Sequence, residues 1–294
     1  MTDKISQLKG LGVAIVTPFL PDGKIDFPAL EKLVDDLVSK RVDYLVALGT
    51  TSESPTLTPE EKRDVVHCIS TVNAGRLPLV MGVGGPDTLR VARDMEAADS
   101  LPVDAFLSVA PYYNKPSQEG LFEHFRYLSE RAPRPVILYN VPGRTSCNLD
   151  AATTTRIALE CKNVIGIKEA SGKMKQILNL LNHKPENFLV ISGDDLITLP
   201  LMAAGMDGLI SVVANAFPAE MANMVHLAMK DQFIKARLYH DRLFNLMQAC
   251  FQEGNPSGIK AVLSVQGKIH NRLRLPNVPV TAALYEKIEQ LVKL

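Results

Sequence analysis

Short hydrophobic runs alternate along most of the chain with longer segments in which hydrophobic residues recur at helical spacing. The short runs are rich in Val, Ile and Leu, which is typical of strands covered on both faces in a parallel sheet. Eight such strands are predicted, near residues 12–16, 44–48, 79–83, 105–109, 136–140, 164–168, 189–192 and 208–212.

The segments between these runs are predicted to be helices. Residues 28–40 place four hydrophobic side chains on one stripe, namely Leu30, Leu33, Val34 and Leu37. Residues 59–73 form a second example, with Thr58 in position to cap the helix. Strands and helices that alternate in this way predict an α/β protein.

Eight strand–helix units in roughly 230 residues match the size of a (β/α)8 barrel. An open, doubly wound sheet would produce much the same alternation. From about residue 218 only helical segments are predicted, interrupted around 254–256 and 276–279. We therefore expect a (β/α)8 TIM barrel catalytic domain over residues 1–230 and a C-terminal helical extension over residues 231–294.

Composition and charge favour a small-molecule partner. The chain has 294 residues, 46% of them hydrophobic and 22% charged, and 32 basic residues balance 32 acidic ones. Without net charge there is no field to attract nucleic acid or an anionic membrane. The first ten residues do not resemble a signal peptide and no run reaches membrane-spanning length, so we expect a cytoplasmic protein. Four scattered cysteines and six histidines without ligand spacing predict free thiols and no metal site.

Reactive side chains follow several predicted strands, where a barrel places its chemistry. They are Gly-Thr-Thr-Ser-Glu at 49–53, Pro-Tyr-Tyr-Asn at 111–114, Tyr-Asn-Val-Pro-Gly-Arg-Thr at 139–145, Lys168, and Ser-Gly-Asp-Asp at 192–195. A lysine at the edge of an apolar interior can supply a neutral amine that attacks a carbonyl. Hydroxyls and backbone amides can hold a carboxylate while a tyrosine moves protons. The pattern indicates Schiff-base chemistry on a carbonyl acid.

Each of these features also has a structural interpretation. Lys168 could be an ordinary lysine at the end of a strand, and Tyr112 and Tyr113 could serve packing or an interface. Arg144 could be a solvated loop residue. Asp194 and Asp195 are predicted to be helix caps and not acids. No role is assigned to any histidine.

Taken together, four motifs resemble those of the dihydrodipicolinate synthase/N-acetylneuraminate lyase family of class I pyruvate aldolases, over essentially the whole chain. The motifs are Gly49-Thr50-Thr51-x-Glu53, Tyr139 to Thr145, Gly166-Ile167-Lys168-Glu169-Ala170-Ser171-Gly172 and Ser192-Gly193-Asp194-Asp195, in the order and spacing of the family. The resemblance implies a (β/α)8 barrel with a helical tail, assembled as a homotetramer that is a dimer of dimers.

Within that family, an arginine after the Val-Pro-Gly turn distinguishes the synthases from the sialic acid lyases, and Arg144 favours the synthases. The resemblance implies condensation of pyruvate with L-aspartate 4-semialdehyde to 4-hydroxy-tetrahydrodipicolinate, in the diaminopimelate and lysine pathway. No cofactor is implied, since the pyruvate imine forms on Lys168 itself.

The resemblance also implies a role for each site residue. Lys168 would form the Schiff base, Thr51 would hold the pyruvate carboxylate, and Tyr139 would relay protons through Thr50. Tyr113 would complete the relay from the neighbouring subunit. Arg144 would bind the carboxylate of the semialdehyde. Backbone groups of Gly193 and Ile210 would line the substrate-binding pocket.

Two departures from the family pattern carry expectations. Ser52 replaces the usual glycine of the Gly-Thr-Thr-Gly-Glu motif, so we expect a shifted loop with intact chemistry. Pro59, Pro86 and Arg90 replace the histidine, asparagine and glutamate with which lysine-inhibited relatives bind lysine, so we expect weak or absent inhibition by lysine.

Two other functions stay open at this point. The nearer is another pyruvate-dependent lyase of the same family, acting on a sugar acid such as N-acetylneuraminate or on a hydroxyproline derivative. The more distant is a relative without catalytic activity.

Overall fold

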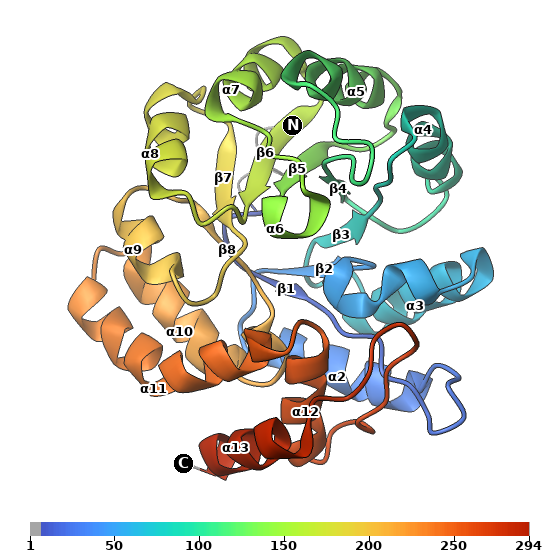
Figure 1. Ribbon diagram of the computed structural model, residues 1–294, viewed down its shortest axis with the longest axis vertical. Coiled ribbons are helices and arrows are strands. Elements are labelled where there is room, and N and C mark those ends of the chain that lie inside the picture. Colours follow the sequence, from blue (N-terminus) through green and yellow to red (C-terminus); the bar gives the residue numbers. More distant parts are fainter. Residues whose placement is uncertain (1–6, 294) are drawn as a thin grey trace.

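Eight parallel strands close into a barrel in sequence order in the computed structural model, which describes residues 7–293 (Figure 1). The strands are β1 (Gly10–Ala14), β2 (Tyr44–Ala47), β3 (Leu79–Gly82), β4 (Ala105–Val109), β5 (Val136–Asn140), β6 (Val164–Glu169), β7 (Leu189–Ser192) and β8 (Gly208–Ser211). Because β8 pairs with β1, the sheet has no open edge. This closure confirms the predicted (β/α)8 barrel and rules out the doubly wound alternative.

Helices surround the barrel on its outer side (Figure 1). They are α2 (Phe27–Ser39), α3 (Pro59–Asn73), α4 (Thr88–Ala97), α5 (Gln118–Arg131), α7 (Ala151–Glu160), α8 (Met174–His183), α9 (Thr198–Ala203) and α10 (Pro218–Ala228). The short helix α6 (Pro142–Thr145) follows β5 directly and lies at the carboxyl end of the barrel. The predicted hydrophobic stripe of α2 is buried, and α3 begins at a capping box in which Thr58 and Glu61 satisfy each other's backbone N–H. The hydrophobic pattern therefore located both helices to within one residue.

Hydrophobic side chains form two layers. One lies between the sheet and the helices, and the other fills the inside of the barrel, with Tyr44, Ile137, Ile191 and Ile210 among its members. Successive strand residues point to opposite faces of a sheet, so each strand contributes to both layers. The interior of the barrel is therefore filled with side chains below its carboxyl end.

A bulge in β6 decides which residues of that strand point into the barrel. Val136 pairs with Val164, but the next residue, Ile137, pairs with Gly166, so β6 carries one extra residue at Ile165. A Cβ added at Gly166 would lie 2.8 Å from the backbone oxygen of Leu189 in β7, which leaves room only for glycine. Beyond the bulge, the strands stay in register to their ends.

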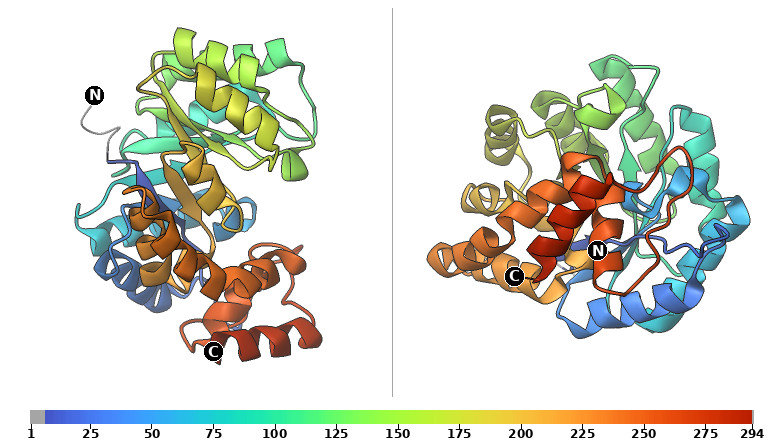
Figure 2. Two further views of the ribbon diagram at one scale, coloured as in Figure 1. Left: turned by 90° about the vertical axis from the view of Figure 1, so that its left-hand side faces the viewer. Right: turned by 60° about the horizontal axis from the view of Figure 1, so that its bottom comes forward.

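Three helices follow the barrel: α11 (Phe233–Gln252), α12 (Ser257–Val265) and α13 (Ala282–Lys293). In Figure 2, α12 and α13 pack together to one side of the barrel. The loops between these helices fall where interruptions were predicted, around residues 254–256 and 276–279. The division of the chain at residue 230 stays a prediction. Among the described helices, none is both long and apolar enough to cross a membrane.

Candidate active site

A cavity of about 510 Å³ lies at the carboxyl ends of the strands, where (β/α)8 barrels carry their active sites. An adjoining cavity of about 350 Å³ shares part of its wall with the first. Both are lined by Thr50, Tyr139, Arg144 and Asn255, and Lys168 lines the first. Residues from the ends of β2, β5, β6 and β7 therefore gather around two adjoining cavities.

Lys168 and Tyr139 are neighbours in the sheet. They are paired in the register of β5 and β6, so both side chains point into the barrel. Both residues are more than nine-tenths buried, and Lys168 Nζ lies 4.5 Å from the centre of the Tyr139 ring. The amine therefore faces the cavity beside a phenol, in surroundings that are largely apolar.

Gly193 makes room for the lysine. A Cβ added at this position would lie 2.9 Å from Lys168 Cε and 2.7 Å from Ala170 Cβ. Its N–H donates to Glu169 O (2.9 Å), which fixes the end of β7 against β6. Glycine is therefore the residue that fits against Lys168 and Ala170 at this point.

Glu169 and Asn140 form the next pair in the same register, on the opposite face of the sheet. Asn140 Nδ2 donates to Glu169 Oε2 (3.0 Å), Ser171 N donates to Glu169 Oε1 (2.6 Å), and Gln176 Nε2 donates to Glu169 Oε2 (3.3 Å). This buried carboxylate thus points away from the cavity and is held by neutral donors. It fixes the strand ends that carry Tyr139 and Lys168.

The turn after β2 carries the two threonines. Residues Thr50–Ser52 form a single turn of 3₁₀ helix, in which Thr51 is buried and Thr50 lies at the cavity wall. Ser52 Oγ donates to Gly49 O (2.7 Å), and the left-handed backbone conformation occurs at Glu53, with φ 54°. A serine fits at position 52 because the positive φ of the turn falls one residue later.

Asn255 was not predicted as a site residue. It follows α11 and belongs to the interruption at 254–256, yet its Nδ2 donates to Thr51 Oγ1 (3.0 Å) and its O accepts from Arg144 Nη2 (3.2 Å). Its own Oδ1 is buried without a hydrogen-bond partner among the described residues. The loop after α11 therefore joins the threonine turn and the arginine in one wall.

Other cavity residues also come from α11. Met247, Gln248 and Phe251 line the first cavity, and the helical periodicity of the sequence gave no sign of this. A helix whose hydrophobic residues partly face a cavity has the same pattern as one that packs against a core. Together with Gln252 they give the cavity a wall of two apolar and two amide side chains.

Two predicted site residues, Tyr113 and Ile210, do not line either cavity. Tyr113 is 88% exposed, with φ 71°, and does not line either cavity in the described part of the chain, whereas Tyr112 lines the second. Ile210 is buried in the barrel interior, and Val212, two residues later, lines the first cavity. The action of Tyr113 from a neighbouring subunit stays a prediction.

The prediction that Asp194 and Asp195 are helix caps is wrong. The next helix, α9, has Ile197 at its N-cap position and no side-chain cap. Asp194 Oδ1 accepts from Leu196 N (3.0 Å) within the turn, and buried Asp195 accepts from Ser211 Oγ and from Val212 N (3.0 Å). Burial raises the pKa of Asp195 to about 6, against the opposing effect of these hydrogen bonds. Asp195 joins β7 to β8 and does not cap a helix.

Within residues 7–293, no group of three or more His, Cys, Asp or Glu side chains is arranged to hold a metal ion. The four cysteines are free. The polar groups that line the first cavity include an amine, a phenol, two threonine hydroxyls, a guanidinium and the carboxylate of Asp194. Together they can form an imine, move a proton and bind a carboxylate.

The comparisons with known proteins cover nearly the full length of the chain. A family model described as the dihydrodipicolinate synthetase family matches residues 7–294. A 4-hydroxy-tetrahydrodipicolinate synthase of Parabacteroides distasonis is 49% identical over 287 residues, which are 98% of this chain and 97% of that protein.

Solved structures agree with this relationship. A monomeric dihydrodipicolinate synthase variant matches with a TM-score of 0.96 and 39% identity, covering 99% of this chain and 98% of that one. A chloride-inhibited dihydrodipicolinate synthase of Acinetobacter baumannii, complexed with pyruvate, matches with a TM-score of 0.95 and 38% identity, covering 97% and 98%.

Proposed function

Because this chain belongs to the dihydrodipicolinate synthetase family, we propose that it condenses pyruvate with L-aspartate 4-semialdehyde to form 4-hydroxy-tetrahydrodipicolinate. The reaction is a Schiff-base condensation of the class I aldolase type and serves diaminopimelate and lysine synthesis. The observation that carries the proposal is the position of Lys168, whose amine faces a cavity beside Tyr139 with Arg144 in the same wall.

The chemistry begins when the neutral amine of Lys168 attacks the keto carbon of pyruvate, and loss of water leaves an imine. The protonated imine draws electrons from the methyl group, so that a methyl proton leaves and an enamine forms. The enamine carbon then attacks the aldehyde carbon of the semialdehyde, whose oxygen takes up a proton. Finally the substrate's own amino group attacks the imine carbon, which closes the ring and releases Lys168. No separate cofactor enters these steps.

The proposed roles follow the positions of the groups. Tyr139 exchanges protons with the reacting carbon and oxygen, and Thr50 passes them on, since both residues line the cavity. Thr51 binds the pyruvate carboxylate, supported by the amide of Asn255. Arg144 binds the carboxylate of the semialdehyde, because its guanidinium is exposed at the cavity and can form a bidentate pair.

Borohydride reduction in the presence of pyruvate tests the proposal directly. The intact mass should rise by one reduced pyruvate adduct, and peptide mapping should place it on Lys168. Lys168→Met should form no adduct and no product, whereas the matched control Lys173→Met, five residues away and exposed, should behave as the parent. A coupled assay with the semialdehyde and with N-acetylneuraminate then separates the synthase from the rival lyases. An adduct with turnover of N-acetylneuraminate alone would overturn the synthase assignment.

The proposed assembly is a homotetramer in which Tyr113 completes the proton relay of a neighbouring subunit. Its support is the exposure of this large aromatic side chain, 88%, on a loop next to the cavity residue Tyr112. Light scattering should give the mass of four chains. Tyr113→Phe should keep that mass and lower turnover. A monomer with full activity would contradict both parts.

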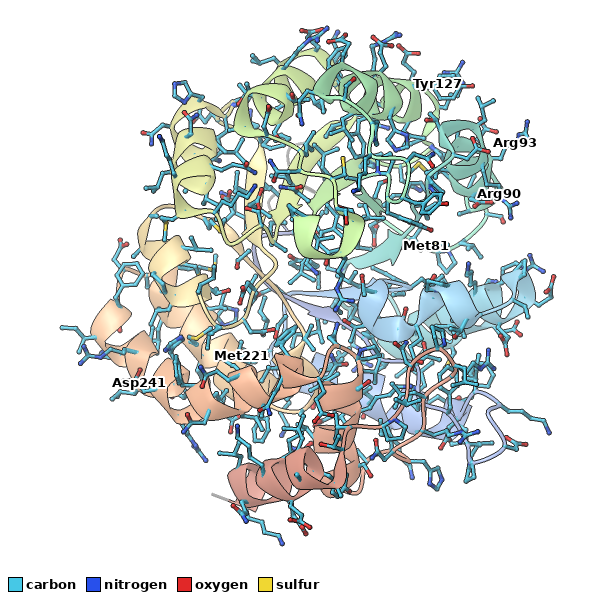
Figure 3. The ribbon with its side chains drawn as sticks, viewed as in Figure 1. Met81, Arg90, Arg93, Tyr127, Met221 and Asp241 are labelled. Atoms are coloured by element: carbon cyan, nitrogen blue, oxygen red, sulfur yellow. The ribbon has the colours of Figure 1, made fainter. Side chains whose placement is uncertain are left out.

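Weak or absent inhibition by lysine is also part of the proposal. Arg90 ion-pairs with Asp94 (3.0 Å), and it lies with Arg93 at the outer edge of α4 (Figure 3). A cation at this position repels the ammonium groups of lysine. Initial rates should stay unchanged at submillimolar lysine.

A cytoplasmic location completes the proposal, since both substrates are metabolic intermediates.

A further inference from the structure

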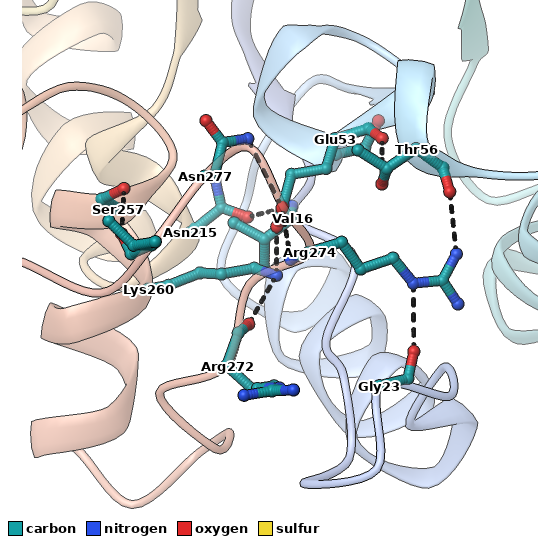
Figure 4. A network of polar contacts seen from close by, with 12 residues as sticks. Val16, Gly23, Glu53, Thr56, Asn215, Ser257, Lys260, Arg272, Arg274 and Asn277 are labelled. Carbon is teal, nitrogen blue, oxygen red and sulfur yellow. Dashed lines mark hydrogen bonds and ion pairs between the residues drawn. The ribbon is translucent and has the colours of Figure 1, made fainter.

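A fully buried ion pair joins the threonine turn to the C-terminal helices. Glu53 follows the turn after β2, and Lys260 lies in α12; neither side chain has any exposed surface. Their charged atoms, Lys260 Nζ and Glu53 Oε1, are 2.5 Å apart (Figure 4). The pair therefore connects residues that are 207 positions apart in the sequence.

The remaining hydrogen-bonding capacity of the pair is used by the segment between α12 and α13. Lys260 Nζ also donates to Arg272 O (3.0 Å), and Glu53 Oε2 accepts from Arg274 N (3.0 Å). The Arg274 side chain continues the network, since it donates to Glu61 at 2.6 and 2.7 Å and to Thr56 O at 2.9 Å. Glu53, Thr56 and Glu61, which lie between β2 and the first turn of α3, are thus tied to residues 272–274 or to Lys260.

This attachment lies close to the proposed pyruvate site. Glu53 is two residues from Thr51, and it has the left-handed backbone conformation that ends the Thr50–Ser52 turn. On the other side, Asn255 holds the hydroxyl of Thr51. The turn therefore has two contacts with the C-terminal part of the chain. One is the hydrogen bond from the Asn255 amide, and the other is the ion pair with Lys260 of α12.

Stability alone does not account for this ion pair. Removing two charges from water costs about as much as their attraction returns, and well-packed hydrophobic replacements are often as stable. The cost is visible at Lys260, where burial lowers the pKa although Glu53 acts in the opposite direction. A rigid, directional contact beside the turn is what the pair provides and a hydrophobic contact would not.

We propose that Glu53 and Lys260 are positioning residues, which hold the Thr50–Thr51 turn in the geometry that binds the pyruvate carboxylate. Glu53 borders only the second cavity, away from Lys168, and the pair acts through the backbone of the turn. This inference rests on the proposed function, because it assumes that Thr51 receives the carboxylate.

The test compares a neutral version of the pair with a control pair. Glu53→Gln together with Lys260→Met removes both charges without leaving one unpaired. Lys268→Met is the control, because Lys268 joins the same C-terminal segment to Asp36 of α2 (2.9 Å), away from the turn. Thermal unfolding confirms folding, and steady-state kinetics and borohydride trapping follow the pyruvate site.

The neutral pair should raise the KM for pyruvate roughly tenfold or more, since small displacements of binding groups have effects of this size. At saturating pyruvate it should still form one adduct per chain on Lys168. The control variant Lys268→Met should have the same pyruvate KM as the parent and form the same adduct. A folded double variant whose pyruvate KM stays within twofold of the parent would overturn the inference.

Two further outcomes are distinguished by the same experiment. If the double variant does not fold, Glu53→Gln alone replaces it, because Lys260 can then lose its proton and stay buried as a neutral amine; the same rise in pyruvate KM is expected, and its absence rejects the inference. If the parent itself forms no adduct, the proposed function fails instead of the positioning role.

Discussion

Glu53 and Glu169 are both fully buried carboxylates next to residues of the cavity, but they are held by different partners. Glu169 accepts hydrogen bonds from a backbone N–H and from the amides of Asn140 and Gln176, all within the barrel. Glu53 has the buried Lys260 of α12, and it accepts from Arg274 N and from the Asn277 amide (3.5 Å) in the segment between α12 and α13. Glu169 thus holds the ends of β5 and β6 together, whereas Glu53 attaches the turn after β2 to α12.

The comparison shows why a cation is among the partners of Glu53, whereas neutral donors hold Glu169. Strands β5 and β6 are already held in register by their backbone ladder, so short neutral contacts are enough at Glu169. The turn at Glu53 has no ladder, and its partner arrives from a distant helix. A long lysine side chain reaches that distance, and its charge makes the contact strong in a low-dielectric interior.

The largest effect is expected from Lys260→Met, which leaves the Glu53 carboxylate buried without its cation. Loss of one partner of a buried pair costs about 3–5 kcal/mol in the free energy of unfolding. Urea unfolding followed by circular dichroism measures the loss. The double variant with Glu53→Gln should recover most of it. A loss below about 1 kcal/mol would remove the distinction between the two carboxylates.

Asp195 extends the comparison to a buried carboxyl that is held by neutral donors, among them the Ser211 hydroxyl and the Val212 N–H. Its pKa of about 6 lies above the ordinary value of 3.8, so the folded state holds the proton more tightly than the unfolded state. Between about pH 4 and pH 6, ionisation of Asp195 therefore lowers the free energy of unfolding as the pH rises.

Asp195→Asn cannot ionise, so it should gain on the parent by on the order of 2–3 kcal/mol between pH 4 and pH 7. Urea unfolding of both proteins at several pH values gives this difference, and its change with pH isolates Asp195 from all other groups. A difference that does not vary with pH would mean that Asp195 is ionised throughout this range.

A smaller effect is expected at Glu169. Glu169→Gln keeps the shape of the side chain but replaces one acceptor with a donor, which opposes the amide of Asn140. One mismatched buried hydrogen bond costs about 1–3 kcal/mol. Borohydride trapping should still find the adduct on Lys168. A loss as large as that of Lys260→Met would show that amides and a cation hold these carboxylates equally strongly.

The smallest effect is expected from Lys268→Met. Its ion pair with Asp36 also joins the C-terminal segment to the barrel, but both side chains are about one-third exposed. Solvent screens such a pair, and its loss should cost about 1 kcal/mol or less in urea unfolding. A larger cost would indicate that attachment of the C-terminal helices, and not burial of charge, sets the order of these effects.

The sequence predicted the barrel and the main residues of the cavity because both depend on local patterns. Hydrophobic runs mark the strands, and a reactive residue at the end of a run marks the catalytic face. The aspartates after β7 show the limit of such reasoning. A local pattern suggested helix caps, but the Asp195 side chain turns to β8, whose position only the fold decides.

The contribution of the C-terminal helices could not be predicted for the same reason. Asn255 bonds to a threonine 204 positions away, and nothing near it in the sequence records that contact. The Gly-Asn-Pro sequence at 254–256 predicted a loop, which is correct. Which surface the loop would cover depends on how α11 packs against the barrel.

The late position of Asn255 and Lys260 in the chain has a consequence for protein synthesis. A ribosome that has just completed β8 has already made every strand, Tyr139 and Lys168. At that moment Thr51 still lacks its amide and Glu53 still lacks its cation, because both come from segments not yet translated. The turn after β2 thus gains these two side-chain partners among the last contacts of the fold, although the turn itself is made within the first fifth of the chain.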